Sequence, residues 1–437
     1  MHDKMKFFRG NFLQSINDQD ACLLVDGIVA VAVDGQSSGR VVAMGPATEI
    51  ADTYELDLAS LPKQAGLYLP AFYDLHFHWV QDDVREMPKA SLLEWLEKYT
   101  FPTEAKYADR GYAREKAEYF WKRILSVGTI GGLCYSSIHE IALEEALRVA
   151  PEHFSIGNVL MTMHCPEALT QTIDEALASV ETCAAKYGAR YAASPRFAPT
   201  TAPEVLEASA RVAERYGCFL QTHLAENLAE VDWVLEMYRA LPGFESVESY
   251  TDIYKRVGML GPKTVFGHCI HLSDAEWQLM ADSQSIIASC PSSNAPMELL
   301  GLGSGLYDWQ KADQFGVRWA LCSDIGGGPF LSMFDVMESF VSQNRAASIS
   351  NASYIQALYR STTIGAELLG LGTTKGRIAV GSDFDAILVP VDQKLLVAGD
   401  PEAILKSVVQ SVKTRQEYDG LVKSTIIKGD VRFKASH

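Results

Sequence analysis

The sequence predicts an α/β protein: a distorted (β/α)8 TIM barrel with a small discontinuous β-sandwich domain formed by both termini. Between residues 67 and 374, short β-prone runs alternate with helical patterns, which is typical of parallel βα units. Several of the runs end at residues that can bind a metal or move a proton. We therefore expect residues 1–66 and 375–437 to form the sandwich and residues 67–374 to form the barrel.

The expected barrel strands are short and apolar. There are eight: Leu67–His76, Gly128–Cys134, Phe154–Met161, Arg190–Pro195, Gly217–His223, Thr264–His268, Ser285–Ser289 and Val317–Asp324. Helices are expected where apolar residues recur at spacings of three and four, at Tyr112–Ser126, Thr172–Tyr187, Ala202–Tyr216, Ser273–Asp282 and Tyr354–Leu369. A longer connection, Asn227–Leu260, follows the fifth strand, and we expect it to form a lid or an interface.

The two ends of the chain have a different texture, with short alternating β-like runs and Gly or Asp turns. These runs are Phe7–Leu13, Cys22–Val33, Gly39–Gly45, Gly376–Pro390 and Ser424–Phe433. Their similarity predicts that the two ends pair into one domain.

Composition and charge restrict the classes of partner. With 437 residues, 48% of them hydrophobic, the chain can bury a large core. The net charge is −17 and no basic stripe occurs, so nucleic acid is not an expected partner. No apolar run is long enough to cross a membrane, and no secretory apolar region follows Met1. Eight cysteines without a CxxC pair fit reduced thiols in a cytoplasmic protein.

Two histidines at the end of the first expected barrel strand are the strongest functional feature. His76 and His78 are two residues apart, so on a strand their side chains point the same way and can bind one metal ion. His223 ends the fifth expected strand, and Asp324 ends the eighth. Because the carboxyl ends of parallel barrel strands meet at one face, we expect these four side chains to form a metal site.

Two further residues point to acid-base chemistry beside this site. Glu226 follows His223 by three residues, and His268 ends the sixth expected strand. Three imidazoles and one carboxylate favour zinc, with iron(II) as the alternative, and zinc lowers the pKa of a bound water to about 7. His268 would orient or deprotonate this water, Asp324 would accept its proton, and Glu226 would deliver a proton to the substrate.

The sequence resembles the amidohydrolase superfamily. Within the mononuclear deaminase branch of that superfamily it is similar to the guanine deaminases. The resemblance rests on the histidine pair at 76 and 78, the quartet His223–Glu226, His268 and Asp324. Four longer segments extend it: residues 92–104 (LLEWLEKYTFPTE), 194–200 (SPRFAPT), 290–294 (CPSSN) and 303–311 (GSGLYDWQK).

The resemblance implies a zinc-dependent aminohydrolase that converts guanine to xanthine and ammonia by metal-activated hydroxide, in purine catabolism. It assigns Gln81 and Arg196 to the edge of the purine and Phe197 to its ring face. Arg196 offers a rigid fork of donors, which suits a ring carbonyl. The resemblance also implies a homodimer with a small-molecule purine as its partner.

Several positions depart from the family pattern and leave the exact ring open. They are Val80, the charged run 82–86, Thr162, an insertion at 296–300 that includes Met297, and three glycines at 326–328 that we expect to make a flexible loop. The alternatives are a hydrolase of another amino-substituted ring, such as a modified purine, pterin or triazine, and a catalytically silent scaffold. A binuclear hydrolase would need a lysine between Arg190 and Thr200, and none occurs there.

Overall fold

The structure, a computed structural model, describes residues 4–89 and 91–435. Its described part divides into two compact units. One takes in Met1–Tyr73, Lys122–Ile130 and Phe330–His437, and the other takes in Asp74–Trp121 and Gly131–Pro329. The division cuts through the barrel's first strand, so the domain boundaries expected at residues 67 and 374 stay a prediction.

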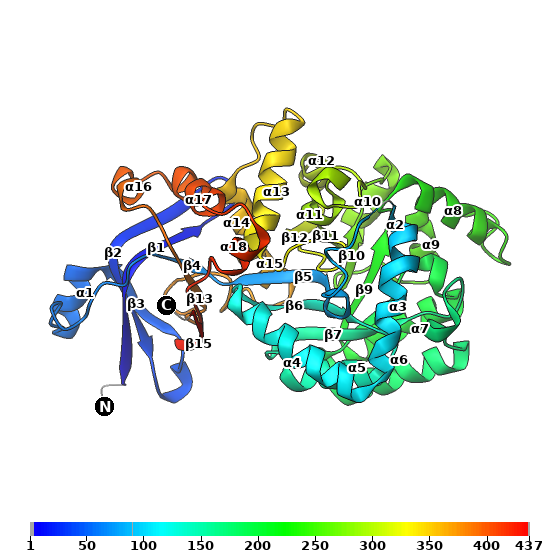
Figure 1. Ribbon diagram of the computed structural model, residues 1–437, viewed down its shortest axis with the longest axis horizontal. Coiled ribbons are helices and arrows are strands. Elements are labelled where there is room, and N and C mark those ends of the chain that lie inside the picture. Colours follow the sequence, from blue (N-terminus) through cyan, green and yellow to red (C-terminus); the bar gives the residue numbers. More distant parts are fainter. Residues whose placement is uncertain (1–3, 90, 436–437) are drawn as a thin grey trace. The chain divides into compact units, whose positions relative to one another are not determined.

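Eight parallel strands form the barrel, as the sequence predicts (Figure 1). In chain order they are β5 (Phe72–His78), β6 (Thr129–Ser136), β7 (His153–Leu160), β8 (Ala192–Pro195), β9 (Phe219–Leu224), β10 (Thr264–His268), β11 (Ile286–Ser289) and β12 (Arg318–Leu321). The chain after β12 returns to β5, where Asp324 N donates to His76 O at 2.8 Å and His78 N donates to Ile325 O at 3.0 Å. These two bonds close the barrel at the end that carries the histidines.

The first expected strand, Leu67–His76, is two strands with different partners. Its beginning, β4 (Leu67–Pro70), pairs with β13 (Ala386–Val389) and β1 (Met5–Ser15) in the terminal sheet. Only the part after Ala71 belongs to the barrel. The sequence could not show this change, because both parts are rich in apolar residues and every residue of both is buried.

The two ends of the chain meet in one seven-stranded sheet of order β15-β14-β13-β4-β1-β2-β3. Its remaining strands are β2 (Ala21–Ala32), β3 (Val41–Pro46), β14 (Ser424–Ile427) and β15 (Asp430–Lys434). Side chains from distant strands, including Val41 of β3 and Ile426 of β14, share one buried core. The sheet therefore folds over on itself, which is how it forms the predicted discontinuous β-domain.

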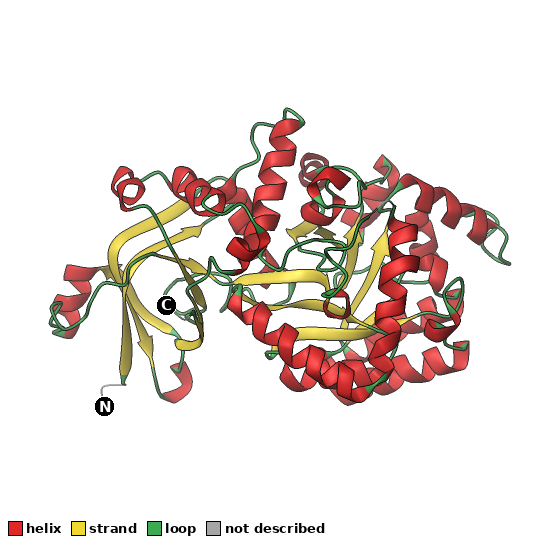
Figure 2. Cartoon of the chain, viewed as in Figure 1, coloured by secondary structure: helices red, strands yellow, loops and turns green. Residues whose placement is uncertain are grey.

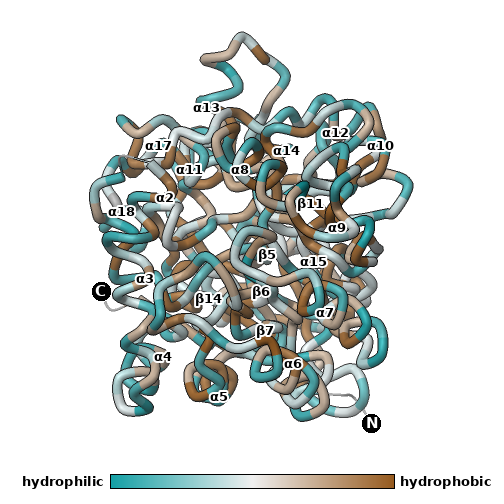
Figure 3. Tube along the Cα trace, turned by 90° about the vertical axis from the view of Figure 1, so that its right-hand side faces the viewer, coloured by the Kyte–Doolittle hydropathy of each residue, from teal (hydrophilic) through white to brown (hydrophobic). Residues whose placement is uncertain are grey.

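Helices connect the strands, and most expected ones are present (Figure 2). Capping boxes begin helices α6 (Ile173–Tyr187), α8 (Leu228–Arg239) and α10 (Asp274–Asp282). Their N-cap residues, Thr172, Asn227 and Ser273, have short polar side chains that satisfy free backbone N–H groups. The expected helix Tyr354–Leu369 is broken at Thr362, whose backbone leaves the helical region. Figure 3 shows both hydrophilic and hydrophobic colour along the helices, as amphipathic helices have.

The α-helices are α1 (Ala47–Tyr54), α2 (Leu92–Trp95), α3 (Phe101–Glu104), α4 (Arg110–Ser126), α5 (Glu140–Val149), α6 (Ile173–Tyr187), α7 (Pro203–Tyr216), α8 (Leu228–Arg239), α9 (Tyr250–Arg256), α10 (Asp274–Asp282), α11 (Pro291–Asn294), α12 (Trp309–Phe315), α13 (Met333–Ala346), α14 (Tyr354–Ser361), α15 (Thr363–Leu368), α16 (Gln393–Ala398), α17 (Pro401–Gln410) and α18 (Arg415–Asp419). A π-helical turn, η3 (Leu96–Thr100), joins α2 to α3. None of the helices in the described ranges is both long and apolar enough to cross a bilayer.

Candidate active site

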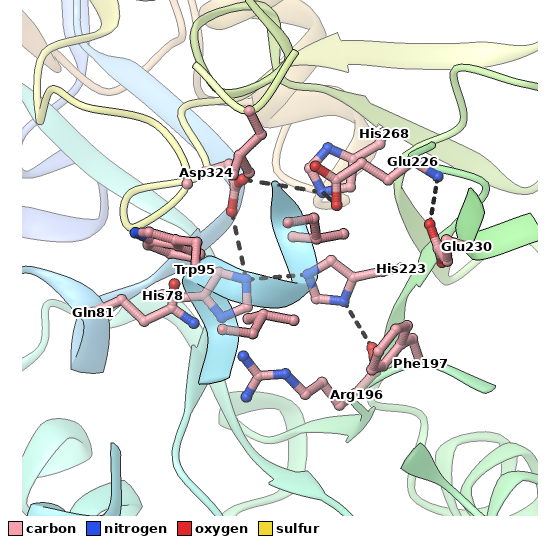
Figure 4. Close-up of a pocket in the computed structure, with 14 residues that line it drawn as sticks. His78, Gln81, Trp95, Arg196, Phe197, His223, Glu226, Glu230, His268 and Asp324 are labelled. Carbon is pink, nitrogen blue, oxygen red and sulfur yellow. Dashed lines mark hydrogen bonds and ion pairs between the residues drawn. The ribbon is translucent and has the colours of Figure 1, made fainter. Parts of the chain in front are cut away.

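Four side chains that the sequence analysis singled out lie close together at the carboxyl end of the barrel. Nε2 of His76 and Nε2 of His78 lie 3.4 and 3.5 Å from Oδ1 of Asp324. Nε2 of His223 lies 3.1 Å from Nε2 of His78 (Figure 4). All four groups therefore direct ligand atoms at one small volume.

The chemistry of these donors fits a divalent metal ion. Both ring nitrogens of His76 are buried and have no hydrogen-bond partner among the described residues. Burial lowers the pKa of His76, and it holds the pKa of His78 and His223 well below the ordinary value, so the imidazoles are neutral, which is the form that binds metal. His223 Nδ1 is 2.7 Å from the carbonyl oxygen of Arg196, which turns Nε2 toward the cluster.

The backbone around this cluster is held in unusual conformations. Ala225, His268 and Asp324 have φ values of 49°, 69° and 47°, in the left-handed region that residues other than glycine seldom adopt. Such strain persists where surrounding structure enforces it and is common at functional sites. Gly267 is also constrained, because a Cβ there would clash with the His76 ring.

Glu226 and His268 face each other beside the four ligand candidates. Nε2 of His268 lies 3.6 Å from Oε2 of Glu226 and 4.0 Å from Oδ2 of Asp324. Burial raises the pKa of Glu226, and the charge of Asp324 adds to this, so the side chain keeps a proton more readily than an exposed glutamate. For Asp324, burial is outweighed by His76 and the neighbouring imidazoles, which hold its pKa well below the ordinary value.

Serine and asparagine side chains hold these acid-base groups in place. Ser304 Oγ donates to Glu226 Oε1 at 3.0 Å, and Ser293 Oγ donates to Asp324 Oδ2 at 2.6 Å. Asn294 Nδ2 lies 3.1 Å from His268 Nδ1. The sequence identified the segments 290–294 and 303–311 as characteristic but did not assign these contacts.

Asp74 forms hydrogen bonds that hold the backbone next to two of the ligand candidates, His76 and Asp324. Its carboxylate accepts hydrogen bonds from Ser323 N at 3.1 Å and His76 N at 3.2 Å, and Ser323 Oγ also donates to it. A completely buried carboxylate thus ties the first barrel strand to the segment that carries Asp324. Sequence reasoning missed this residue, although it precedes His76 by two positions.

The three expected substrate contacts also line this cavity. Gln81 follows β5, whereas Arg196 and Phe197 follow β8, and all three are buried. The complete lining is His78, Gln81, Leu92, Trp95, Leu96, Arg196, Phe197, His223, Glu226, Glu230, His268, Leu302, Asp324 and Gly327. Trp95 packs in a buried cluster and also lines the cavity.

Glu104, at the end of α3, was not expected to have a role. Its carboxylate accepts a hydrogen bond from Gln81 Nε2 at 2.8 Å and another from Arg196 Nη1 at 2.7 Å. The side chain is completely buried and lies outside the cavity lining. One carboxylate therefore contacts both polar residues that were expected to bind the purine edge.

Of the departures from the family pattern, Gly327 lines the cavity. Val80, Thr162 and Met297 are absent from its lining. Lys89 Nζ donates to Gly327 O at 2.5 Å and to Leu300 O at 2.8 Å, so it joins the insertion to the loop after Asp324.

The three glycines at 326–328 are packed closely. A Cβ on Gly326 would clash with Gln81, one on Gly327 with Asp324, and one on Gly328 with the Ser323 carbonyl. Glycine therefore serves close approach here, and the expected flexibility of the loop stays a prediction.

The long connection Asn227–Leu260 contains α8 and α9 and supports strand ends. Tyr254 Oη donates to His223 O at 2.9 Å, and Tyr238 Oη donates to Ala198 O at 3.1 Å. Both tyrosines are completely buried. The connection thus helps to position His223, and the expected lid or interface stays a prediction.

Residues 67–432 match the amidohydrolase family, and the chain belongs to this family. Together, the family and the site define a metal-dependent hydrolase. The chain is 33% identical over 332 residues to a guanine deaminase of Escherichia coli (strain K12), covering 74% of this chain and 73% of that protein.

A guanine deaminase of Dictyostelium discoideum is 28% identical over 413 residues, covering 88% of each chain. The crystal structure of a guanine deaminase from Bradyrhizobium japonicum superposes with a TM-score of 0.85 at 25% identity, covering 99% of this chain and 100% of that one.

Proposed function

We propose that this protein is a guanine deaminase that hydrolyses guanine to xanthine and ammonia. The observation that carries the proposal is the cavity itself, which His78, His223 and Asp324 line together with the polar pair of Gln81 and Arg196. His76 lies beside them in the same group of possible metal ligands. The similarity to guanine deaminases supports the same substrate.

The polar pair suits one edge of guanine. Guanine carries a ring N1–H donor beside the C6 carbonyl acceptor. The guanidinium of Arg196 can donate to the carbonyl, and the Gln81 amide oxygen can accept from N1–H. Phe197 also lines the cavity, and the centre of its ring lies 6.5 Å from that of His223. From this position it would cover one face of the guanine ring. This placement would bring C2, the carbon that bears the amino group, toward His223 and Asp324.

We propose that His76, His78, His223 and Asp324 hold one zinc ion, because three imidazoles and a carboxylate suit zinc better than magnesium or calcium. Iron(II) is the alternative. When bound, such an ion lowers the pKa of a water molecule to about 7.

The chain's own residues then move the protons. Asp324 accepts a proton from the attacking water while His268 orients its oxygen toward C2. Glu226, whose pKa burial raises, gives its proton to the ring nitrogen beside C2. The C–N bond then breaks as the amino group takes up the proton held by Asp324 and leaves as ammonia. The C2 hydroxyl returns a proton to Glu226 and becomes the carbonyl of xanthine.

The test is a substrate panel on the purified, metal-loaded protein. Guanine, adenine, a pterin and a triazine are incubated separately, and ammonia release is measured for each. We expect ammonia from guanine, with xanthine formed in equal amount, and little from adenine. Good activity on the pterin or the triazine without activity on guanine would overturn the proposed substrate.

The homodimer and the place in purine breakdown that the sequence resemblance implies stay predictions. Equilibrium sedimentation of the purified protein tests the first of them.

A further inference from the structure

We propose that Glu104 is a positioning residue that sets the substrate preference of this site, by fixing which atoms of Gln81 and Arg196 face the substrate. This inference rests on the proposed guanine deaminase activity.

The contacts of Glu104 divide evenly between the two residues. Oε1 accepts from Gln81 Nε2 at 2.8 Å, and Oε2 accepts from Arg196 Nη1 at 2.7 Å. The three side chains are buried, with Glu104 completely so. Buried hydrogen bonds to charged groups are stronger than neutral ones, so this carboxylate strongly favours one arrangement of both partners.

The charge of Glu104 decides the orientation of the Gln81 amide. Glu104 forms an ion pair with Arg196, and a carboxylate in such a pair offers only acceptor atoms. Gln81 must therefore turn its NH2 group toward Glu104, which leaves its oxygen as the free atom. Figure 4 shows the Gln81 nitrogen on the side of Arg196 and the oxygen on the side of His78 and Trp95.

Arg196 is restrained by the same carboxylate and by its surroundings. Nη1 is taken by Glu104, and the guanidinium carbon lies 5.2 Å from the centre of the Phe101 ring. The remaining N–H groups are left for the substrate. Arg196 also places its carbonyl oxygen on His223, so its backbone is tied to the metal cluster.

The result is a fixed polarity, with an acceptor on Gln81 and donors on Arg196. Guanine presents the complement, N1–H and a C6 carbonyl. A purine with an amino group at C6 presents the reverse, an acceptor at N1 and a donor at C6. Glu104 makes no contact with the cavity itself, so it acts on the substrate only through its two partners.

The test compares guanine with 2,6-diaminopurine, which keeps the amino group at C2 but carries another at C6. In Glu104→Gln, the side chain can donate as well as accept, so the Gln81 amide is free to turn. We expect the Michaelis constant for guanine to rise more than kcat falls. The preference is the ratio of kcat/KM for guanine to kcat/KM for 2,6-diaminopurine, or the ratio of their affinities from competitive inhibition. This ratio should fall by about tenfold or more in the variant.

Glu276→Gln is the matched control. Glu276 is also a buried glutamate, and it accepts hydrogen bonds from Thr251 and Ser273 at the start of α10. This variant should keep the wild-type preference. Metal content is measured in both variants and should match the wild type.

Three outcomes decide the question. An unchanged preference in Glu104→Gln, with or without lower activity, overturns the role of Glu104. If Glu104→Gln does not fold, Glu104→Asp is tested in its place. The shorter carboxylate cannot reach both Gln81 and Arg196, so the preference for guanine over 2,6-diaminopurine should fall in this variant as well. A wild-type protein without activity on guanine would instead overturn the proposed function.

Discussion

At the scale of single residues, burial prepares Glu226 for proton delivery. Its carboxyl group lies inside the cavity, where loss of water disfavours the charged form and raises its pKa. Ser304 and His268 limit its orientation. A side chain in this state keeps a proton more readily than an exposed glutamate, and it lies beside His268 in the cavity.

We predict that Glu226→Gln keeps the metal but loses activity by on the order of 10²–10⁴-fold, the usual scale for acid-base catalysis. Metal analysis and steady-state kinetics on the same sample provide the check. His223→Ala is the contrast, since it should lose metal and activity together. Near-normal turnover in metal-replete Glu226→Gln would remove Glu226 from the mechanism.

Gly267 gives a second prediction at this scale. An added Cβ would clash with the His76 ring, so Gly267→Ala should displace a ligand, reduce metal content and destabilise the protein by about 1–3 kcal/mol. Gly261→Ala is the control in the loop before the same strand, where the nearest atom lies 4.0 Å from the added Cβ. Equal metal content in both variants would contradict the close packing of β10 against His76.

The residues that the sequence could identify were those at strand ends with unusual chemistry. His76, His78, His223 and Asp324 stand out because each can bind a metal and each closes an apolar run. Glu104 could not be found in this way, because a lone glutamate after Pro102 looks like a solvated helix residue. Its role depends on contacts with Gln81 and Arg196, which only the folded chain brings near.

At the scale of elements, Lys89 links two loops over the cavity. It contacts the carbonyl oxygens of Gly327 and Leu300, and burial lowers its pKa to about 8. Leu300 has a φ of 67°, and its exposed side chain leaves the insertion with little packing of its own. The lysine is thus a main attachment of the insertion.

We predict that Lys89→Met releases the insertion, residues 296–300, and makes it several times more sensitive to limited proteolysis. The Michaelis constant for guanine should rise, because Leu302 and Gly327 line the cavity next to the released segments. Lys98→Met is the control, since Lys98 is an exposed lysine on the neighbouring π-helical turn. Identical cleavage of the two variants would show that Lys89 does not hold the loops.

Helix α8 carries a pH-dependent contribution. Burial, followed by the charge of Glu226, raises the pKa of Glu230 to about 7. The folded protein therefore binds more protons than the unfolded chain between the ordinary glutamate pKa and about 7, so stability falls as pH rises through this range.

Replacing Glu230 with Gln removes this titration. We predict that, from about pH 5 to pH 8, the variant gains on the order of 1–3 kcal/mol in unfolding free energy relative to the wild type. Glu175→Gln is the control, because Glu175 caps α6 in the same way but is exposed. Denaturant unfolding at several pH values measures the difference in unfolding free energy between Glu230→Gln and the wild type. A difference that does not change with pH would contradict the raised pKa of Glu230.

The barrel strands could be predicted because each is a short apolar run between helical patterns. What the sequence left open was which sheet a buried run joins. Residues 67–75 are apolar apart from Asp74, yet the first part of the run 67–78 pairs with the terminal sheet and the second with the barrel. Hydrogen-bond partners of this kind are set by chain topology, which a local pattern does not contain.

For the whole molecule, a metal that binds only the folded state adds to stability. We predict one ion per chain, and we expect its removal by a chelator to lower the melting temperature. At a free metal concentration 100 times the dissociation constant, binding adds about 2.7 kcal/mol to the free energy of unfolding. Calorimetry with and without chelator, together with metal analysis, checks both statements. Two tightly bound ions per chain would contradict the single cluster.

The most direct test of the account is to follow guanine hydrolysis in water enriched with oxygen-18, using guanine labelled with nitrogen-15 on the 2-amino group. Mass spectrometry of the products from the metal-loaded protein should find xanthine with one labelled oxygen at C2, and ammonia that carries the nitrogen label. Metal-depleted protein should form neither product. Recovery of unchanged guanine from the metal-loaded protein, or xanthine without the oxygen label, would contradict hydrolytic deamination at this site.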